Sequence, residues 1–245
     1  MSVESHVLEQ AASGQITFWH RARFQFVADQ VDAEAARSVF DYGAGAGGLA
    51  SYITRSGTSQ YFFYDESPQV MDHLRETIGR SSDGYSLLGS GRAQLTVALD
   101  VIEHIEDDLA AVKVLASSTQ PGGRVIITVP ALPLVWSSWD VRLGHFRRYT
   151  RRSLRAVCLA AGLEPIEISY LFPEMLPAAL FRRLTDDVAE PGEDASFPSF
   201  APLVDSALYS LARATTRMRL LMPFGTSVVA VLRRPLDDLS GMEES

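Results

Sequence analysis

Short apolar runs alternate with longer helix-compatible stretches along most of the chain. The runs have the length and the β-branched or aromatic content of buried strands, and they cover 39–42, 60–64, 95–99, 124–130, 164–171 and 226–232. A shorter run, Tyr85 to Leu88, is expected to add a strand between the second and third of these. Strands that alternate with helices predict right-handed crossovers and a parallel sheet with helices on both faces.

Turn and capping residues mark the ends of several expected helices. Ser67 followed by Pro68 is a typical helix start, with Ser67 as the N-cap. Thr150 is expected to cap a helix that holds Cys158, and Gly162 is expected to end it. Two more helices are expected, one over about 4–32 and one around 203–217.

The composition favours one main α/β domain. With 245 residues and 47% hydrophobic content, the chain can bury a full core. A formal net charge of −8 argues against a large nucleic-acid surface, which needs clustered Lys and Arg. The single cysteine allows no disulfide framework and no signal peptide is evident, so we expect a cytoplasmic location. The apolar stretch 220–232 is too short and too broken by Pro223 and Gly225 to span a membrane.

Clustered glycines follow the first expected strand, at Gly43, Gly45, Gly47 and Gly48. A strand, a glycine-rich turn and a helix predict a loop that cradles a nucleotide, because glycine accepts positive φ and lets the main chain approach a ligand. Asp65 ends the second strand-like run, where a carboxylate can accept hydrogen bonds from both hydroxyls of a ribose. The same glycines also fit the dinucleotide pattern of nicotinamide enzymes, or a simple tight connection.

Aromatic and basic residues gather before the first strand. Phe18 and Trp19 stand close to Arg21 and Arg23, and the segment could form a flap over the ligand site from which Arg23 reaches a carboxylate. The alternative is an amphipathic packing helix with solvated arginines.

The motifs together resemble the class I S-adenosylmethionine-dependent methyltransferases, and small bacterial members in particular. Asp41, two residues before Gly43, is a feature such methyltransferases share, and no separate substrate domain follows, as a nicotinamide dehydrogenase would usually have. The matching segments are 18–21, 39–45, Asp65, 98–104, 121–123 and 144–150.

This resemblance implies a Rossmann-like sheet of seven mostly parallel strands, with helices on both faces and an antiparallel last strand. The expected layout of a single methyltransferase domain is an N-terminal helical cap (1–36), a cofactor-binding core (37–172), a helical lid insertion (173–222), the final strand (223–236) and a disordered tail (237–245).

The resemblance also implies roles for individual residues toward S-adenosylmethionine. Gly43, Ala44 and Gly45 would line its methionine part, while Asp41 would organise the loop or bind the amino group. Asp65 would hold the ribose, with Glu66 beside it. Further cofactor contacts are expected from Arg23 and, at the ligand-binding edge of the sheet, from Leu99, Asp100 and Val101.

The adenine site is less clear from the sequence. The family often places an acidic residue after the third strand to contact the adenine. In this chain Gly89 and Ser90 are expected to stand there.

His145 is the candidate catalytic residue. An imidazole titrates near neutrality, and the loop that carries His145 is expected to leave the sheet at the ligand-binding edge, so it could serve as a general base. The alternative is that His145 and Arg147 pack this loop against Asp140 or Glu103. Arg147 and Arg148 could receive an anionic group of the acceptor, or could be solvated.

A metal site is the sharper alternative. If a helix begins directly after the strand 95–99, then Asp100, Glu103 and His104 share one face of it, and His145 could complete a mixed oxygen and nitrogen site. A structural role for Glu103 and His104 at the strand–helix junction is favoured, so no metal is predicted.

The sequence therefore predicts a cytoplasmic methyltransferase that uses S-adenosylmethionine on a small, partly hydrophobic acceptor, in secondary metabolism. The insertion 173–222 has the apolar residues of a lid, although the same residues could form a homodimer surface. An NAD(P)-dependent oxidoreductase and a non-catalytic relative that binds S-adenosylmethionine are the alternatives. An RNA methyltransferase is disfavoured by the net charge.

Overall fold

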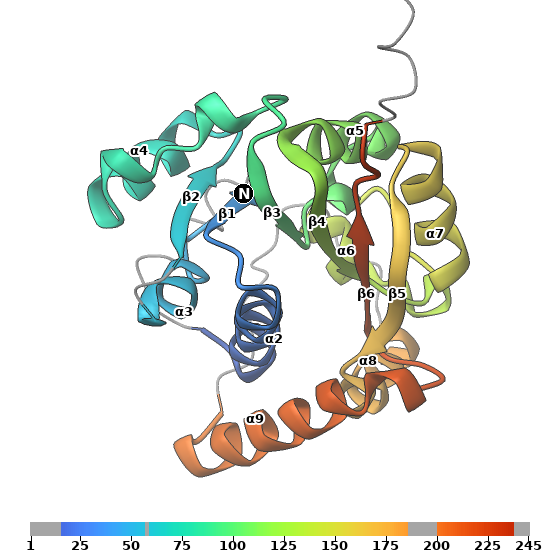
Figure 1. The fold of residues 1–245 in the computed structure, drawn as a ribbon. Helices are drawn as coiled ribbons and strands as arrows, with labels where there is room; N and C mark the ends of the chain where they lie inside the picture. The colour runs from blue at the N-terminus through green and yellow to red at the C-terminus, as the bar shows by residue number, and fades with distance from the viewer. Residues whose placement is uncertain (1–15, 57–58, 186–199, 238–245) are drawn as a thin grey trace, which may run out of the picture.

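A computed structural model describes residues 16–56, 59–185 and 200–237. Within these residues one mixed sheet has the strand order β2-β1-β3-β4-β6-β5 (Figure 1). β1, β2, β3 and β4 run parallel, and β6 is antiparallel to both β4 and β5. The predicted Rossmann-like sheet with an antiparallel last strand is confirmed. The strands are β1 (Ser38–Tyr42), β2 (Gln60–Tyr64), β3 (Ala93–Leu99), β4 (Thr119–Pro130), β5 (Glu164–Leu171) and β6 (Ser227–Arg233).

The prediction of seven strands is wrong, because the described residues form six. The expected strand at Tyr85 to Leu88 is instead a short 3-10 helix, Tyr85–Leu87. Only an isolated parallel bridge between Phe63 and Asp83 remains beside β2. The Gly84 amide donates to the Phe63 carbonyl and the chain then turns, so Leu87 packs in the core while Tyr85 is 68% exposed.

Helices cover both faces of the sheet. The α-helices are α2 (Phe18–Glu34), α3 (Ala50–Ile53), α4 (Pro68–Thr77), α5 (Asp108–Ser118), α6 (Ser138–Arg142), α7 (Arg151–Ala160), α8 (Leu176–Thr185) and α9 (Pro202–Arg217). One core cluster joins α2, α3 and α4 to the sheet, and a second joins α5 and α7 to the other face. In β6, Val229 packs in the first cluster and Val228 in the second, as the period of two in a strand requires.

The expected helix ends are largely confirmed. Ser67 accepts a hydrogen bond from the Val70 amide at 3.2 Å, and Thr150 forms a reciprocal cap with Ser153. Gly162 follows α7 with a φ of 80°, a left-handed conformation that suits glycine. The helix expected around 203–217 is α9.

The helix expected over about 4–32 is described only as α2, since its first part lies outside the described residues. The polar segment 190–199 and the expected tail from 238 also lie outside them. Across the described chain, no helix combines the length and the apolar character needed to cross a membrane.

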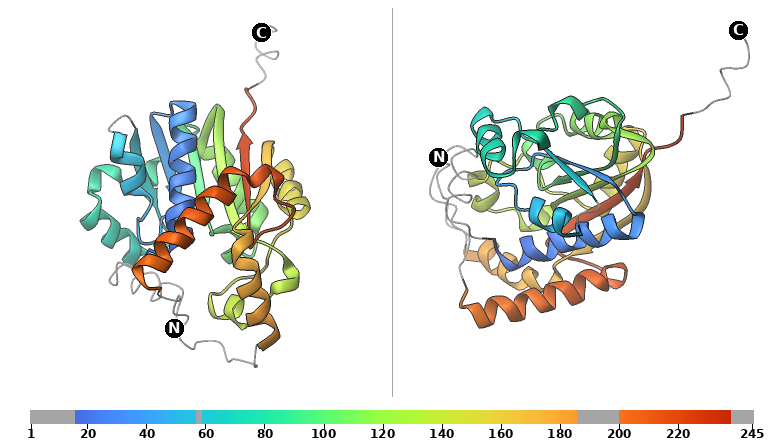
Figure 2. Two further views of the ribbon diagram at one scale, coloured as in Figure 1. Left: turned by 90° about the horizontal axis from the view of Figure 1, so that it is seen from below. Right: turned by 60° about the vertical axis from the view of Figure 1, so that its left-hand side comes forward.

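The insertion places α9 across α2, as the two views of Figure 2 show. Arg213 pairs with Asp29 of α2 at 2.8 Å, and Arg21 of α2 pairs with Asp205. Two ion pairs therefore hold α9 against α2, and α2 packs on the sheet.

Candidate methyl-transfer site

The glycine loop lies at the carboxyl ends of β1 and β2. The amides of Gly43 and Ala44 donate to the Tyr64 carbonyl at 2.8 and 3.0 Å, which ties the loop to the neighbouring strand. Gly43 and Gly45 have φ values of 74° and 53°, so both take the left-handed conformation that the motif predicts. A Cβ at Gly43 would lie 2.6 Å from Val101 Cγ2, so only glycine fits against the chain that follows β3.

Asp65 links the glycine loop to the next helix. One carboxylate oxygen accepts from the Gly45 amide at 3.1 Å, and the other accepts from the Ser67 amide at 3.1 Å. Burial raises the pKa of Asp65, and the hydrogen bonds from Ser67 and Gly45 oppose this. Glu66 beside it is exposed. Asp65 thus stands at the end of β2, in contact with the glycine loop, where a ribose-binding carboxylate is expected.

Asp41 lies inside β1, below the loop. It is 3% exposed and accepts a hydrogen bond of 2.6 Å from the Tyr61 hydroxyl. Burial raises its pKa to about 7, because a single neutral donor replaces the water that would solvate the ionised form. Asp41 therefore joins β1 to β2 just before the glycine loop, and both of its predicted roles stay predictions.

Arg23 and Asp100 form an ion pair at the end of β3. Arg23 is 3% exposed and donates to Asp100 Oδ2, and it also reaches Ser227 Oγ at 3.3 Å. Asp100 has a φ of 55° and accepts a further hydrogen bond from Thr128 at 3.1 Å. The arginine is thus buried against a carboxylate of the chain itself rather than solvated.

The helix directly after β3 that a four-ligand metal set would need is absent from the described residues. Residues 102–104 form a single 3-10 turn, and Asp100 in the left-handed region points its carboxylate to Arg23. Of the four residues in the alternative metal set, Asp100 is therefore not in the group. The other three, Glu103, His104 and His145, do come together, with one donor atom from each within 4.8 Å of the others.

Asp140 organises the loop that carries His145. It is fully buried and accepts from His145 Nδ1 at 2.8 Å, from Arg148 Nε at 2.7 Å and from the Ser137 amide at 3.0 Å. Burial raises the pKa of Asp140, but these hydrogen bonds outweigh it and leave the pKa below its usual value. The predicted packing of His145 against Asp140 is present, and it leaves the far ring nitrogen of His145, Nε2, for another partner.

The paired arginines hold the same loop. Arg147 donates to the carbonyls of Ile105 and Glu106 at 3.0 and 2.6 Å, and Arg148 donates to the Ala131 carbonyl at 3.1 Å. Both guanidinium groups are therefore engaged within the chain.

Glu103 is the least explained group in the site. It is fully buried, and neither carboxylate oxygen has a hydrogen-bond partner among the described residues. Burial raises its pKa well above the usual range, and the charge of Asp100 adds to this. Beside it, burial lowers the pKa of His104 to about 4, and its ring meets the ring of His145 edge to face at 4.7 Å.

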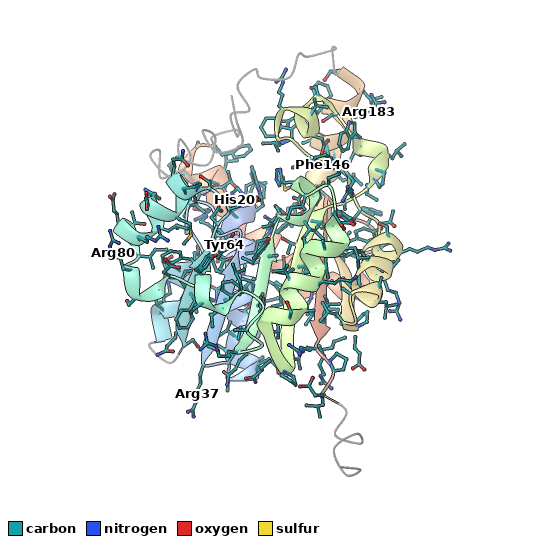
Figure 3. The ribbon with its side chains drawn as sticks, turned by 90° about the horizontal axis from the view of Figure 1, so that it is seen from above. His20, Arg37, Tyr64, Arg80, Phe146 and Arg183 are labelled. Atoms are coloured by element: carbon teal, nitrogen blue, oxygen red, sulfur yellow. The ribbon has the colours of Figure 1, made fainter. Side chains whose placement is uncertain are left out.

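The turn after β3 and the loop that carries His145 lie at the same end of the sheet as the glycine loop. Figure 3 shows Tyr64, at the end of β2, on the same side of the molecule as His20 and Phe146, whereas Arg37, before β1, lies at the opposite end. The Phe146 amide donates to the Glu103 carbonyl at 2.7 Å, which joins the His145 loop to the end of β3.

An acidic residue that the sequence analysis did not name lies beside β2. The residue bridged to β2 is Asp83 rather than Gly89 or Ser90. Asp83 pairs with Arg75 at 2.8 Å and accepts from the Tyr85 amide at 2.9 Å. The rings of Tyr42 and Tyr64 stack at 5.5 Å beside it, and Tyr64 lies 6.1 Å from Tyr85. The sequence signal that could have located this position is Asp83-Gly84, eighteen residues after Asp65.

A sequence model described as "Methyltransferase domain" matches residues 18–168, more than half of the chain. The chain belongs to this methyltransferase family. Its cofactor is S-adenosylmethionine, and the methyltransferase interpretation of the glycine loop is confirmed against the nicotinamide alternative. A search of curated proteins finds no match.

Solved structures support the same fold. The methyltransferase resembles the (4+2)-cyclase SpnF, with a TM-score of 0.57, 16% identity, and coverage of 96% of this chain and 93% of that one. It also resembles geranyl diphosphate methyltransferase in complex with GPP and sinefungin, with a TM-score of 0.56, 15% identity, and coverage of 88% and 79%. A third similar structure is a SAM-dependent methyltransferase from Archaeoglobus fulgidus, with a TM-score of 0.53, 13% identity, and coverage of 86% of this chain and 94% of that one. At these identities the likeness concerns the fold and does not define the methyl acceptor.

Proposed function

We propose that this methyltransferase transfers the methyl group of S-adenosylmethionine to a hydroxyl of a small, partly hydrophobic acceptor. The observation that carries the proposal is the Asp140–His145 pair at the end of the sheet where the glycine loop lies. Since Asp140 holds His145 through Nδ1, Nε2 can take the proton that a hydroxyl must lose before its oxygen attacks the methyl carbon.

The cofactor would extend across the glycine loop. In this arrangement Asp65 binds the ribose, and the stacked tyrosines beside Asp83 supply a face for the adenine. The methionine part lies over Gly43 and Gly45, with its amino and carboxylate groups near Asp100 and Arg23. Methyl transfer needs in-line alignment and exclusion of water more than covalent help from the protein.

Apolar residues near His145 favour a partly hydrophobic acceptor. The helix α8 packs by the turn at 133–135, and its Arg182 lies over the Trp139 ring at 4.3 Å. Phe146, Phe181 and Leu134 are exposed around this loop at 53%, 69% and 82%. The same side chains would suit a homodimer surface. A place in secondary metabolism and in the cytoplasm remains part of the proposal, the latter because the chain has one cysteine, buried in α7.

The proposal is tested by following S-adenosylhomocysteine release with a panel of small phenols, hydroxy acids and amines, and with a short RNA as the contrast. We expect turnover with hydroxyl acceptors, a loss of about 10²–10⁴ in kcat for His145→Gln, and unchanged S-adenosylhomocysteine affinity in that variant. Asp65→Ala should lose cofactor affinity instead. Turnover with amines or RNA alone would contradict the proposal.

A further inference from the structure

The buried group that methyl transfer leaves unexplained is Glu103. An ionised carboxylate without hydrogen bonds is unfavourable inside a protein, and a polar group that is kept there needs a partner. The described neighbours of Glu103 include His104 and His145, whose donor atoms lie with its own within 4.8 Å of one another. Neither imidazole donates to the Glu103 oxygens.

Each of the two histidines keeps one ring nitrogen without a hydrogen-bond partner among the described residues. His145 Nδ1 is bound to Asp140, so Nε2 remains. For His104 the main chain of Leu143 and Gly144 takes a ring hydrogen bond, while Nδ1 is shielded from solvent and has no partner in the described chain. A histidine that binds a metal commonly donates its other nitrogen to a carboxylate or a carbonyl, which fixes the ring and its tautomer. His145 is bound in this way to the carboxylate of Asp140, and His104 is bound to the main chain of Leu143 and Gly144.

The local charge also leaves room for a cation. Three carboxylates, those of Asp100, Glu103 and Asp140, face the guanidinium groups of Arg23 and Arg148. These two arginines donate to Asp100 and Asp140, and among the described residues no cationic side chain forms an ion pair with Glu103.

We propose that Glu103, His104 and His145 bind one divalent metal ion, with Zn²⁺ the best match, and that the open position of the ion receives the hydroxyl oxygen of the methyl acceptor. Two histidines and one glutamate form a set that leaves catalytic zinc a position for substrate. Donors around a zinc ion lie about 3.3 Å apart, given bonds of about 2.0–2.1 Å, so small side-chain rotations close the site.

The ion would change how the acceptor is activated. A hydroxyl oxygen bound to a divalent cation loses its proton to solvent near neutral pH. The oxygen then forms a bond with the methyl carbon while the carbon–sulfur bond breaks, and that electron pair returns to sulfur in S-adenosylhomocysteine. With the ion bound, His145 Nε2 is a ligand and the acceptor proton goes to solvent, whereas in the metal-free enzyme Nε2 is the base of the proposed function. The acceptor class rests on the proposed function, whereas the metal site does not.

The first test measures metal binding by the full-length chain without cofactor or acceptor. Protein dialysed against a chelator is titrated with Zn²⁺ alone and analysed for bound metal, and Co²⁺ is added separately to record its visible absorption. We expect one Zn²⁺ per chain, with affinity lowered at least 10-fold in Glu103→Gln and in His104→Gln. His73→Gln, on the helix α4 outside the cluster, is the matched control and should bind as the wild type does.

S-adenosylhomocysteine binding by each variant serves as the check on folding, because the glycine loop does not include these residues. A chain that binds S-adenosylhomocysteine but takes up no stoichiometric Zn²⁺ would overturn the metal site and leave the proposed function standing. Zn²⁺ binding that is equal in wild type and in both cluster variants would also overturn it.

The second test concerns the acceptor position and uses 4-nitrocatechol, whose absorption shifts when its oxygens bind a metal. The shift should occur with Zn²⁺-loaded wild type and be absent from the metal-free protein and from Glu103→Gln. Stoichiometric Zn²⁺ without any shift would overturn the acceptor part of the proposal.

Discussion

The glycine loop and the loop that carries His145 lie at the same end of the sheet, but different interactions hold them. Main-chain hydrogen bonds to Tyr64 and the close contact of Gly43 with Val101 hold the glycine loop. The His145 loop depends on buried charges, because Asp140 accepts hydrogen bonds from two side chains and one amide. A main-chain cradle suits a cofactor that many enzymes share, whereas side-chain networks can change with the acceptor. We therefore expect a substitution in one of these two loops to leave the function of the other loop intact.

The largest effect is expected from Asp140→Asn. The change removes the charge that compensates buried Arg148, and its single amide oxygen cannot accept both from His145 and from the Ser137 amide, so the free energy of unfolding should fall by about 3–5 kcal/mol. Denaturant unfolding followed by fluorescence measures this. Asp72→Asn, at a carboxylate that is 72% exposed, is the control and should change stability by less than about 0.5 kcal/mol.

The comparison is sharpened if folded Asp140→Asn protein is assayed in mild conditions. It should keep S-adenosylhomocysteine affinity and lose methyl transfer. An equal loss of S-adenosylhomocysteine affinity and of methyl transfer would show that the glycine loop and the His145 loop do not act independently.

A smaller effect on stability is expected from Gly43→Ala, which should abolish cofactor binding. The new Cβ would combine a φ of 74° with the 2.6 Å contact to Val101, and we expect a cost of about 2–4 kcal/mol. Gly162→Ala is a matched control, since Gly162 has a φ of 80° but no heavy atom within 4 Å of the added Cβ. Its cost should be about 1 kcal/mol. Calorimetric titration with S-adenosylhomocysteine measures the loss of cofactor binding, and thermal unfolding measures the loss of stability. The difference in stability between the two variants gives the cost of the contact with Val101, since both carry the backbone strain.

Val101→Ala in the Gly43→Ala background tests the contact directly. The double variant should recover part of the lost stability, because the clash is removed while the strained φ remains. No recovery would mean that the strained φ alone accounts for the loss.

The smallest effect, about 1.4 kcal/mol for each pH unit, is a pH dependence of the cofactor-free protein due to Asp41. Its pKa of about 7 in the folded chain lies above the value of 3.8 that it would have when exposed. The folded state therefore holds this proton more tightly, so its contribution to stability is complete below pH 4 and is lost as pH rises through 7. Between these limits the loss is about 1.4 kcal/mol per pH unit.

Asp41→Asn should flatten this part of the stability profile, since its amide oxygen still accepts from Tyr61 and has no charge to bury. Chemical unfolding of both proteins between pH 5 and pH 8 measures the difference. Parallel profiles for wild type and variant would show that Asp41 is not the titrating group.

The difference between the glycine loop and the His145 loop also explains which sequence predictions succeeded. Asp65, Ser67 and the glycines make contacts close in sequence or between neighbouring parallel strands, so local pattern and strand order were enough to place them. The four residues of the alternative metal set were not all brought together, because Asp100 lies apart from the other three. A left-handed residue at Asp100 has no sequence signal, and it turned that carboxylate away to Arg23, seventy-seven residues earlier in the chain.

The sequence by itself determined the element order, the glycine loop and the family, because these depend on hydrophobic period, turn chemistry and motifs of fixed spacing. Only the tertiary structure decided that Tyr85 to Leu88 is not a strand, because the chain turns at Gly84 after its bridge to β2, which buries Leu87 but leaves Tyr85 exposed. It also decided that Glu103 is buried beside His104 and His145. The approach of a strand end to a loop some forty residues later depends on how the chain packs, and residue spacing does not encode it.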